Sequence, residues 1–394
     1  MNKKSVKDID IKNKKVLMRV DFNVPQDENL HITDDTRIRA ALPTIRYALD
    51  NNARLILMSH LGRPKGGPDP KYSLTPVAER LSQLLGKSIL MAPDCIGPTV
   101  KGIVNGMKAQ DILLLENVRF YKQEEANDPA FAKELASLGD VYVNDAFGSA
   151  HRAHASTEGA TKYLPSVAGF LVQKEIEYFE KAVTNPAKPY VAILGGAKVS
   201  DKIDVIKNLM KRVDALLIGG GMAYTFLKAQ GLDVGGSKLE ADKIDLAREI
   251  LAEAKKRNVK ILLPVDHIIA DKLDASADAR VTDGAAIPAG MLGLDIGPKT
   301  VQLFEGELQK AKTIVWNGPL GVFEIDKFDK GSRDIAKFIA GLKATSIIGG
   351  GDTAAAIAKF ALEAKMSHIS TGGGASLEYL EGKVLPGIAA LQDK

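Results

Sequence analysis

The sequence predicts an α/β protein with two Rossmann-like, three-layer domains, each built on a parallel sheet, joined by a helix hinge. Three observations support this fold class. The chain has 394 residues, which is more than one domain core usually contains. Short runs of β-branched and leucine residues recur along it, and amphipathic stretches separate most of them. Strands that alternate with helices form parallel sheets through right-handed crossovers.

The apolar runs fall into two groups, and each run is apolar on both faces, as buried parallel strands are. The first group contains KVLMRVDF, ARLILMSH, KSILMAP, DILLLENV and DVYVNDAF. The second contains PYVAILGG, DALLIGGG, VKILLPVD, KTIVWNGP, TSIIGGGD and HISTGGG. Apolar residues spaced three and four positions apart indicate helices in DDTRIRAALPTIRYALDNN, DPAFAKELASLGD, SDKIDVIKNLMKRV and DTAAAIAKFALEAK.

A charged amphipathic segment, FLVQKEIEYFEKAVTNPAKP, separates the two groups of strands. It ends in Asn-Pro-Ala-Lys-Pro, and such residues are typical of a loop after a helix. We therefore expect a first domain over residues 1–170, a linker helix over 171–189 and a second domain over 190–371.

The composition argues against several partner classes. The net charge of +4 and the pI near 8.8 are mild, and the basic residues form no dense block, which disfavours a nucleic acid partner. The start, MNKKSVKDIDIKNKK, is charged throughout, and no run approaches the ~18 apolar residues of a membrane-spanning helix. The lone Cys95 suits a reducing compartment and is interpreted as a core residue. We expect a cytoplasmic protein without a membrane partner.

Arginines concentrate in the first half of the chain, where nine of the 14 precede residue 186 and several directly follow strands. Ligands of open parallel sheets bind at the carboxyl ends of the strands, where a guanidinium offers a planar fork for carboxylate or phosphate. In SHLGRP, Gly62 and Pro64 fix the backbone around Arg63, and a strand delivers His60 to the same edge. Taken alone, His60 is as readily a hydrogen-bonded core residue.

Other strand ends in this half repeat the pattern. Asp21 and Asn23 follow the first strand and either orient ligand hydroxyls or cap the next turn. Arg37 lies near the start of a helix, where an anion also meets the helix dipole, although a solvated arginine is equally consistent. Arg119 and Arg152 follow two later strands, so we predict a convergent basic cluster. A metal site at the two histidines of SAHRAHAS is disfavoured because no third ligand has suitable spacing.

The second half has glycine-rich turns after its strands. In YVAILGGAKVSDK, two glycines lead to a predicted helix on which Lys198 and Lys202 share a face, so both could reach the same phosphates. The GxxxxGK[ST] signature is absent, and a solvated lysine pair is the alternative. Three more such turns occur in LLIGGGMAYTF, IIGGGDTAAA and HISTGGGASLE. Backbone N–H groups can approach a phosphate closely at such turns.

Polar residues accompany these turns. Asp352 stands where a helix begins, and it either caps that helix or holds Mg²⁺ through its carboxylate. WNGPLGVFE brings Asn317, Pro319 and Glu324 to the end of another strand, where a base and a ribose could be held. No GxGxxG turn with an acidic residue ~20 positions later follows the first strand of either half, which weakens a dinucleotide interpretation.

Together these segments resemble the phosphoglycerate kinase family of the bacterial type. The resemblance covers nearly the whole chain in the family's order through RVDFNVP, SHLGRP, LENVRF, DAFGSAHRAHAST, LGGAKVSDK, GGGMAYTF, GLDIGP, WNGPLGVFE, GGGDT and STGGGASLEYLEGK. It implies a monomeric glycolytic kinase that reversibly transfers a phosphoryl group from 1,3-bisphosphoglycerate to MgADP, giving 3-phosphoglycerate and MgATP. It also implies that a tail over residues 372–394 packs back on the N-terminal domain.

The resemblance assigns residues motif by motif. The triose would be bound in the first domain by Asp21, Phe22, Asn23, Arg37, His60, Leu61, Gly62, Arg63, Arg119 and Arg152. The nucleotide would be bound in the second domain by Lys202, Gly293, Asn317, Glu324, Gly350, Gly351, Asp352 and Thr353. The magnesium ion would be held by Asp352.

The implied chemistry needs no general base, because the attacking carboxylate has a pKa near 4 and is already ionised at neutral pH. It needs charge neutralisation and in-line placement, for which the candidates are Arg37, Lys198, Lys202, Gly372 and Gly373. We expect hinge closure when both substrates bind. The alternative functions are a dehydrogenase, which would need the missing GxGxxG turn, and a two-domain anion- or nucleotide-binding protein without kinase turnover.

Overall fold

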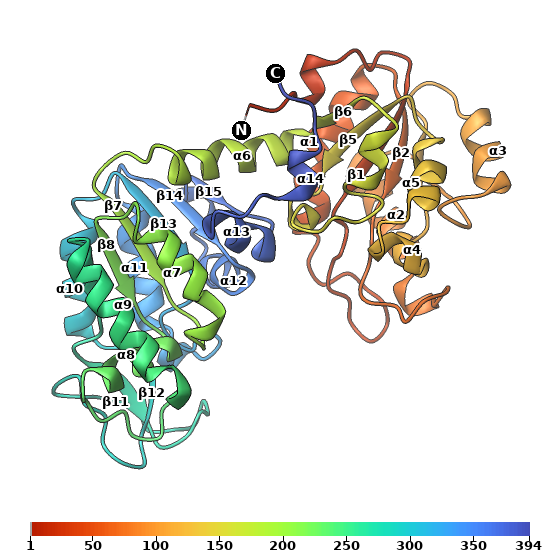
Figure 1. Ribbon diagram of the computed structural model, residues 1–394. Coiled ribbons are helices and arrows are strands. Elements are labelled where there is room, and N and C mark those ends of the chain that lie inside the picture. The colour runs from red at the N-terminus through yellow and green to blue at the C-terminus, as the bar shows by residue number, and fades with distance from the viewer. Residues whose placement is uncertain (1) are drawn as a thin grey trace. The chain divides into compact units, whose positions relative to one another are not determined.

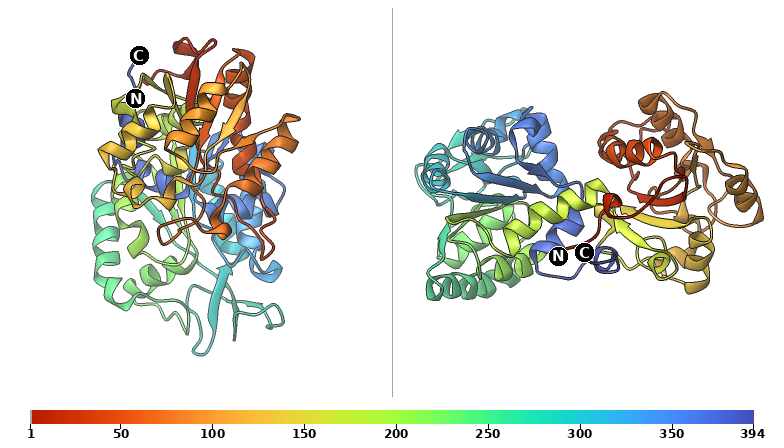
Figure 2. Two further views of the ribbon diagram at one scale, coloured as in Figure 1. Left: turned by 90° about the vertical axis from the view of Figure 1, so that its right-hand side faces the viewer. Right: turned by 90° about the horizontal axis from the view of Figure 1, so that it is seen from above.

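The computed structural model describes residues 2–394, so residue 1 of the predicted first domain lies outside the described residues. Packing divides the chain into two units: unit 1 contains residues up to 177 together with 384–394, and unit 2 contains 178–383. Each unit has a six-stranded parallel sheet, with helices on both faces (Figures 1 and 2). The predicted fold class is therefore confirmed.

The sheet of unit 1 has the strand order β3-β4-β2-β1-β5-β6. Its strands are β1 (Lys15–Val20), β2 (Arg54–Met58), β3 (Leu90–Met91), β4 (Ile112–Leu114), β5 (Val141–Asp145) and β6 (Ser166–Ala168). In register, Met18 of β1 faces Leu57 of β2 and Val143 of β5. The sequence missed β6, whose three residues are too few to show a periodic pattern.

The helices of unit 1 are α1 (Thr36–Asp50), α2 (Thr75–Leu85), α3 (Pro98–Gly106), α4 (Lys122–Glu125), α5 (Pro129–Ala136) and α14 (Pro386–Ala389). Short 3-10 helices span Val6–Asp8, Pro70–Tyr72, Val118–Phe120, Phe147–Ser149 and Gly159–Lys162. The apolar faces of α1 and α2 pack on one side of the sheet, where Ile38, Ile45 and Val77 join the core formed with Met18 and Val20.

The large sheet of unit 2 has the order β15-β14-β13-β7-β8-β9. Its strands are β7 (Tyr190–Leu194), β8 (Ala215–Ile218), β9 (Lys260–Leu262), β13 (Thr313–Asn317), β14 (Thr345–Gly349) and β15 (His368–Ile369). The helices are α7 (Ile203–Leu209), α8 (Gly221–Ala229), α9 (Ile244–Lys256), α10 (Pro298–Leu308), α11 (Lys330–Ala340), α12 (Gly351–Lys359) and α13 (Gly373–Leu380), with 3-10 helices at Ser200–Lys202, Ala241–Lys243, Asp326–Phe328 and Glu363–Lys365.

Unit 2 also contains a small antiparallel sheet that the sequence did not predict. Its order is β11 (Arg280–Val281), β10 (His267–Ala270), β12 (Leu292–Ile296). It packs on a small apolar cluster that includes Ala270, Leu294 and Phe328. The strands are short and β12 contains a glycine and an aspartate, so no apolar run marks them.

Two edge strands, β3 and β9, differ from the predicted pattern of full burial on both faces. Leu90 of β3 is 46% exposed, and Lys260 of β9 is exposed. An edge strand lacks a neighbour on one side, so solvent reaches its side chains. The prediction holds for the central strands, because β7 and β13 are buried throughout.

Helix α6 (Phe170–Val183) contains the point at which the chain leaves unit 1 for unit 2. The carboxylate of Asp145, at the end of β5, accepts hydrogen bonds at its first turn from the N–H groups of Leu171 at 2.9 Å and Val172 at 3.4 Å. This arrangement caps the helix that the sequence places in the linker.

The chain returns to unit 1 later than the predicted tail boundary at residue 372. Residues 372–383, which include α13, belong to unit 2, where the side-chain amide of Asn208 on α7 donates to the carbonyl of Leu380 at 2.5 Å. The following residues, 384–394, belong to unit 1, where the amide of Asn144 donates to the carbonyl of Gly387 at 3.0 Å.

Candidate functional site

Asp21 follows β1 at the carboxyl edge of the first sheet and is 8% exposed. Its Oδ1 accepts a hydrogen bond from Nη1 of Arg37 at 3.0 Å. Burial opposes ionisation of this carboxyl, but attraction to the side chains of His60, Arg37 and Arg19 holds its pKa below the ordinary value; at neutral pH the guanidinium groups carry the positive charge. Asp21 is therefore ionised at neutral pH and orients a guanidinium at the start of α1.

His60 follows β2 at the same edge and is 5% exposed. Its Nδ1 lies 3.1 Å from Nη2 of Arg19. Burial lowers the pKa of His60 well below its usual range, against the attraction of Asp21, and Arg19, Arg119 and Arg37 lower it further. The imidazole is neutral at neutral pH, so the arginines supply the positive field there.

The SHLGRP loop is held on both sides of Gly62. The N–H of Gly62 donates to Oδ1 of Asn23 at 2.8 Å, and its carbonyl accepts from Nη1 of Arg119 at 2.8 Å. Gly62 has φ +60°, and a Cβ there would lie 2.4 Å from the Tyr72 ring, so only glycine fits. These contacts fix the backbone that carries Arg63.

The predicted triose residues differ in what they can offer. The side chains of Phe22 and Leu61 lie in the core, so only their backbone could face a ligand. The exposed guanidinium groups of Arg63 and Arg152 have no hydrogen bond or ion pair with any residue in 2–394. Nε of Arg119 lies 3.3 Å from Oε1 of Glu125. The cluster therefore keeps unneutralised positive charge.

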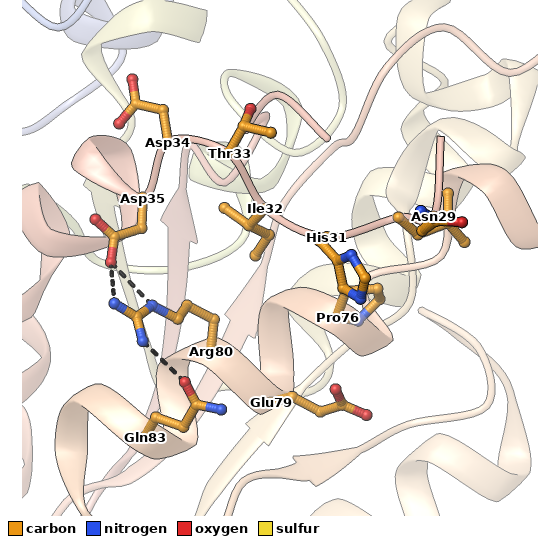
Figure 3. A pocket seen from close by; sticks show the side chains of 11 residues that line it. Asn29, His31, Ile32, Thr33, Asp34, Asp35, Pro76, Glu79, Arg80 and Gln83 are labelled. Carbon is orange, nitrogen blue, oxygen red and sulfur yellow. Dashed lines mark hydrogen bonds and ion pairs between the residues drawn. The ribbon is translucent and has the colours of Figure 1, made fainter. Parts of the chain in front are cut away.

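A hollow of about 820 Å³ in unit 1 is lined by loop 29–35 and by α2. Figure 3 shows the side chains that line it. Nη2 and Nε of Arg80 donate to Oδ2 of Asp35 at 2.7 and 2.9 Å, and Nη1 donates to Gln83 at 2.8 Å. Asp35 immediately precedes α1 and also accepts from Arg39. No predicted site residue lines this hollow. Its ion pairs hold Asp35, which lies two residues before Arg37, at the start of α1.

Unit 2 contains a cavity of about 580 Å³. Three of the predicted nucleotide residues line it: Gly293, Glu324 and Asp352. The sequence did not identify the apolar wall formed by Leu273, Leu292, Leu294, Val322 and Phe323, nor the polar Ser237 and Lys238. Part of this wall comes from β12, which the sequence did not predict as a strand, although GLDIGP covers Leu294 and WNGPLGVFE covers Val322 and Phe323. A flat apolar wall with few polar groups suits a base.

Gly293 shows why the cavity wall is open at this point. Its N–H donates to Oγ of Ser237 at 2.8 Å. A Cβ on Gly293 would lie 2.3 Å from the hydroxyl of Tyr224. The absence of a side chain therefore allows the backbone of β12 to pack directly on the tyrosine.

Lys202 is 8% exposed and donates hydrogen bonds to Oδ1 of Asn317 and, at 3.3 Å, to its carbonyl oxygen. Burial lowers the pKa of Lys202 to about 8, against the attraction of Asp201 and Asp352. The Nδ2 of Asn317 is buried and has no partner within residues 2–394. Both groups can therefore gain partners when an anion binds.

Lys198 does not share a helix face with Lys202, contrary to the prediction. It is exposed in the loop before a 3-10 helix at Ser200–Lys202, and α7 begins only at Ile203. The carboxylate of Glu240 accepts from the N–H groups of Val199 at 2.5 Å and Ser200 at 3.1 Å. Because Glu240 lies 40 residues away from Ser200, local spacing could not reveal this cap.

The N-termini of α12 and α13 come together at the glycine-rich turns. A Cβ on Gly373 would lie 3.4 Å from the N–H nitrogen of Gly351, so the Gly350–Gly351 and Gly372–Gly373 turns are neighbours. Two helix N-termini together form a favourable anion site; in the ligand-free chain the N–H of Gly372 donates to Oγ of Ser370 at 3.2 Å, so an anion would have to replace this contact. Thr353 has a structural contact: its buried Oγ1 accepts from the N–H of Gly318 at 2.6 Å.

Comparisons with known proteins identify the family. A sequence model described as "Phosphoglycerate kinase" matches residues 6–383. The chain belongs to the phosphoglycerate kinase family. It is 62% identical to the phosphoglycerate kinase of Koribacter versatilis, with all of both chains covered, and 58% identical to the cytosolic phosphoglycerate kinase 3 of Arabidopsis thaliana, with 99% and 98% covered.

Its fold matches that of a solved member of the family. The phosphoglycerate kinase from Coxiella burnetii superimposes with a TM-score of 0.89 at 44% identity, over 98% of both chains. The chain is therefore a phosphotransferase that acts as a phosphoglycerate kinase. Among its described helices, none combines the length and apolar character needed to cross a membrane.

Proposed function

We propose that the chain transfers a phosphoryl group reversibly between 1,3-bisphosphoglycerate and MgADP, giving 3-phosphoglycerate and MgATP. The observation that carries this proposal is the presence of two chemically different sites, one in each unit. Unit 1 offers a cluster of arginine side chains at the carboxyl edge of its sheet, and unit 2 offers an apolar cavity beside two helix N-termini. The first suits a small triose anion, and the second suits a nucleotide.

In unit 1, Asp21 and Asn23 would orient hydroxyl groups, and His60 would donate to the triose. The guanidinium groups of Arg37, Arg63, Arg119 and Arg152 would bind its carboxylate and phosphate oxygens as planar forks. Support comes from the ion pair that orients Arg37 and from the clamp on Gly62. Phe22, Leu61 and Gly62 would contribute backbone groups only.

In unit 2, the base would lie against the apolar wall near Gly293, and Glu324 would accept from a ribose hydroxyl. The phosphates would lie at Gly350, Gly351 and Thr353, beside Lys202 and Asn317. The buried unpartnered amide of Asn317 supports this placement, because a phosphate oxygen would satisfy it.

The residues present fit a magnesium ion. Asp352 is exposed, lines the cavity and lies close enough to Lys202 to influence its pKa. Its side chain makes no capping hydrogen bond at the start of α12. Within residues 2–394 no cluster of three or more histidine, cysteine or acidic side chains could hold a metal. Mg²⁺ usually binds one or two carboxylates together with substrate phosphates, so Asp352 would hold it, and the ion would neutralise phosphate charge.

The residues of the chain would stabilise a loose, in-line transition state. Arg37 would bind the carboxylate end of the triose, while Lys202 and Lys198 would neutralise charge on the transferring group. Backbone N–H groups of Gly372 and Gly373 would donate to its oxygens. The ionised carboxylate attacks phosphorus as the bond to the ADP oxygen breaks, so no proton is transferred and no general base is needed.

A coupled assay tests this function. Purified protein is mixed with 3-phosphoglycerate and MgATP, and the acyl phosphate is reduced by an NADH-linked dehydrogenase. We expect NADH oxidation that requires both substrates. Oxidation at the rate of a blank without the protein would contradict kinase activity and favour a binding protein without turnover; NADH oxidation without the coupling enzyme would favour a dehydrogenase.

We also propose that the chain acts as a monomer in the cytoplasm. The lone buried Cys95, which suits a reducing compartment, supports the location. Analytical ultracentrifugation at assay concentration tests the oligomeric state, and a sedimentation coefficient above that of a 42.2 kDa particle would contradict it.

A further inference from the structure

Next to the arginine cluster of unit 1, a series of hydrogen-bonded side chains has no role in the proposed phosphoryl transfer. It joins Glu124, Ser156, Arg19 and His60. Arg19 is 1% exposed, and Glu124 and Ser156 are fully buried. Oγ of Ser156 lies 2.5 Å from Oε1 of Glu124 and 2.8 Å from Nε of Arg19, and Nη2 of Arg19 lies 3.1 Å from Nδ1 of His60.

The direction of every hydrogen bond in this chain follows from the chemistry of Arg19. A guanidinium can only donate hydrogen bonds. Ser156 therefore accepts from Arg19, and the single hydroxyl hydrogen of Ser156 is directed to the carboxylate of Glu124. At the other end, Nδ1 of His60 must accept from Arg19, so this nitrogen carries a lone pair and no proton.

Further hydrogen bonds fix Ser156 and Arg19 in place and so hold the orientation of the Arg19 guanidinium. The N–H of Ser156 donates to Oε2 of Glu124 at 2.8 Å, so Glu124 holds both polar groups of this residue. The hydroxyl of Tyr142 donates to the carbonyl of Ser156 at 2.8 Å. Nη1 of Arg19 also donates to the carbonyl of Val20. The three nitrogens of the Arg19 guanidinium therefore have three different partners: Ser156, Val20 and His60.

The charges around His60 favour its neutral form. Burial is the largest influence and opposes an imidazolium there; Asp21 favours the charged form, while Arg19, Arg119 and Arg37 repel it. A neutral imidazole has one N–H group. Because Nδ1 accepts from Arg19, that proton is on Nε2, which has no hydrogen-bond partner among residues 2–394.

We propose that Arg19 is a positioning residue that holds His60 as the neutral Nε2–H tautomer, so that His60 presents a hydrogen-bond donor to the triose. This inference rests on the proposed function for the placement of the triose. Carboxylate and phosphate oxygens are acceptors only, so the opposite tautomer would direct a lone pair at them. The Glu124–Ser156 end supplies the negative charge that allows a guanidinium to remain buried.

Nuclear magnetic resonance of the ligand-free full chain with ¹⁵N-labelled histidine tests the tautomer directly. Long-range ¹H–¹⁵N correlations distinguish the protonated from the unprotonated ring nitrogen, and the signal that His60→Gln removes identifies the residue. We expect a protonated Nε2 and an unprotonated Nδ1 throughout pH 6–8. An imidazolium, or a proton on Nδ1, at pH 7 would overturn the proposal, and this reading is made on the wild-type chain.

Two variants test whether Arg19 sets the tautomer. Arg19→Gln replaces a group that can only donate with an amide that can also accept, so we expect both tautomers. Ser156→Ala keeps Arg19 but removes its anchor, and we expect a smaller shift in the same direction. Arg46→Gln, an exposed arginine of α1, is the matched control. The proposal would be overturned if folded Arg19→Gln showed only the Nε2–H tautomer. If Arg19→Gln does not fold, the same result in Ser156→Ala would overturn it.

Kinetics separate positioning from general damage. Loss of one hydrogen bond to a charged ligand corresponds to about a tenfold change in binding. We therefore expect Arg19→Gln to raise KM for 3-phosphoglycerate about tenfold while KM for ATP stays nearly constant. Equal changes in both KM values would indicate a structural effect and count against the proposal.

Ligand titration distinguishes failure of this inference from failure of the proposed function. Adding 3-phosphoglycerate to the wild-type chain should move the Nε2–H signal of His60. An unmoved signal in a protein with the expected tautomer would contradict the placement of the triose. A moved signal in a protein with the opposite tautomer would support that placement and contradict the role of Arg19.

Discussion

Lys202 holds a buried ammonium group whose side-chain hydrogen-bond partner in the described chain is Asn317. A lysine in this state is poised for a phosphate, because an anion would replace a neutral amide as its partner. If Lys202 stabilises the transferring group, its removal should act on kcat. We expect Lys202→Ala to lower kcat by about 10²-fold or more, as removal of one preorganised donor does in other enzymes. A change confined to KM would indicate ground-state binding alone.

The pKa of Lys202 gives a second residue-scale prediction. Burial lowers it to about 8 in the ligand-free chain, so the ammonium group loses its charge as pH rises through this value. The pH dependence of kcat/KM reports the pKa values of essential groups in the free enzyme. We therefore expect kcat/KM for ATP to fall above pH 8. Lys202→Arg should remove this fall, since a guanidinium stays charged. The control is Lys207→Arg, an exposed lysine on α7, and an unchanged profile in Lys202→Arg would assign the fall to another group.

At this scale the sequence singled out residues that follow strands, such as Asp21 and His60, and Lys202 in the segment after the glycine turn of β7. It did not predict how they are held. Glu240, which caps the turn before Lys202, and Glu124, which anchors Arg19, act across long sequence separations. Periodicity and motif spacing describe only neighbours along the chain, so such contacts become visible in the folded structure alone.

Among the helices, α6 has an unusual cap. Asp145 is fully buried, one of its oxygens accepts from two N–H groups, and Oδ2 has no partner in residues 2–394. Burial raises its pKa to about 7, although hydrogen bonds with Thr44, Leu171 and Val172 oppose this. The contribution of this carboxyl to the free energy of unfolding is therefore complete below pH 4 and is lost as pH rises through 7.

We therefore expect Asp145→Asn to flatten the dependence of stability on pH. The amide keeps an acceptor for Leu171 but does not ionise. Wild-type protein should lose up to about 1.4 kcal/mol of unfolding free energy per pH unit from this group between pH 5 and 7, and the variant should not. Urea unfolding at several pH values measures the slope. Asp50→Asn, at the exposed end of α1, is the control, and equal slopes in wild type and Asp145→Asn would contradict the role of burial.

The approach of α12 and α13 allows a test of their shared N-terminal site. A Cβ on Gly373 would make an ordinary contact, 3.4 Å from the nitrogen of Gly351, so Gly373→Ala should fold. Its methyl group would occupy space needed by a phosphoryl oxygen, and we expect kcat to fall about tenfold or more. Gly306→Ala, in open space within α10, should gain similar helix propensity and keep wild-type kcat. Equal kcat values in the two variants would contradict a phosphate site at this turn.

The sequence predicted most elements of the two large sheets because central strands and amphipathic helices repeat their patterns over many residues. It missed β6 and the β10–β11–β12 sheet: β6, β10 and β11 are short, and a glycine and an aspartate interrupt the apolar run of β12. This omission also hid part of the nucleotide cavity, since β12 supplies Leu292 and Leu294. The order of strands within each sheet likewise follows from long-range packing.

For the molecule as a whole, the separation of the two proposed sites has a mechanical consequence. One lies in unit 1 and the other in unit 2. Two segments join the units: α6, within which the chain passes from Glu177 to Tyr178, and the return after Lys383. Direct transfer requires donor and acceptor atoms to approach within ~3–3.5 Å, so binding of both ligands should favour arrangements in which the sites are close.

We expect the radius of gyration from small-angle X-ray scattering to fall when 3-phosphoglycerate and MgATP are both present, because each ligand alone contacts one unit and cannot bridge them. Closure would also exclude water, which otherwise hydrolyses an acyl phosphate. The matched control is the variant Lys202→Ala with the same ligands. This variant retains the triose site but lacks the contact between Lys202 and the transferring phosphoryl group. Compaction of the wild type with either ligand alone would show that closure does not need the second site. An unchanged radius of gyration at saturating concentrations of both ligands, in a sample that turns over, would show that transfer proceeds without a change in the separation of the units.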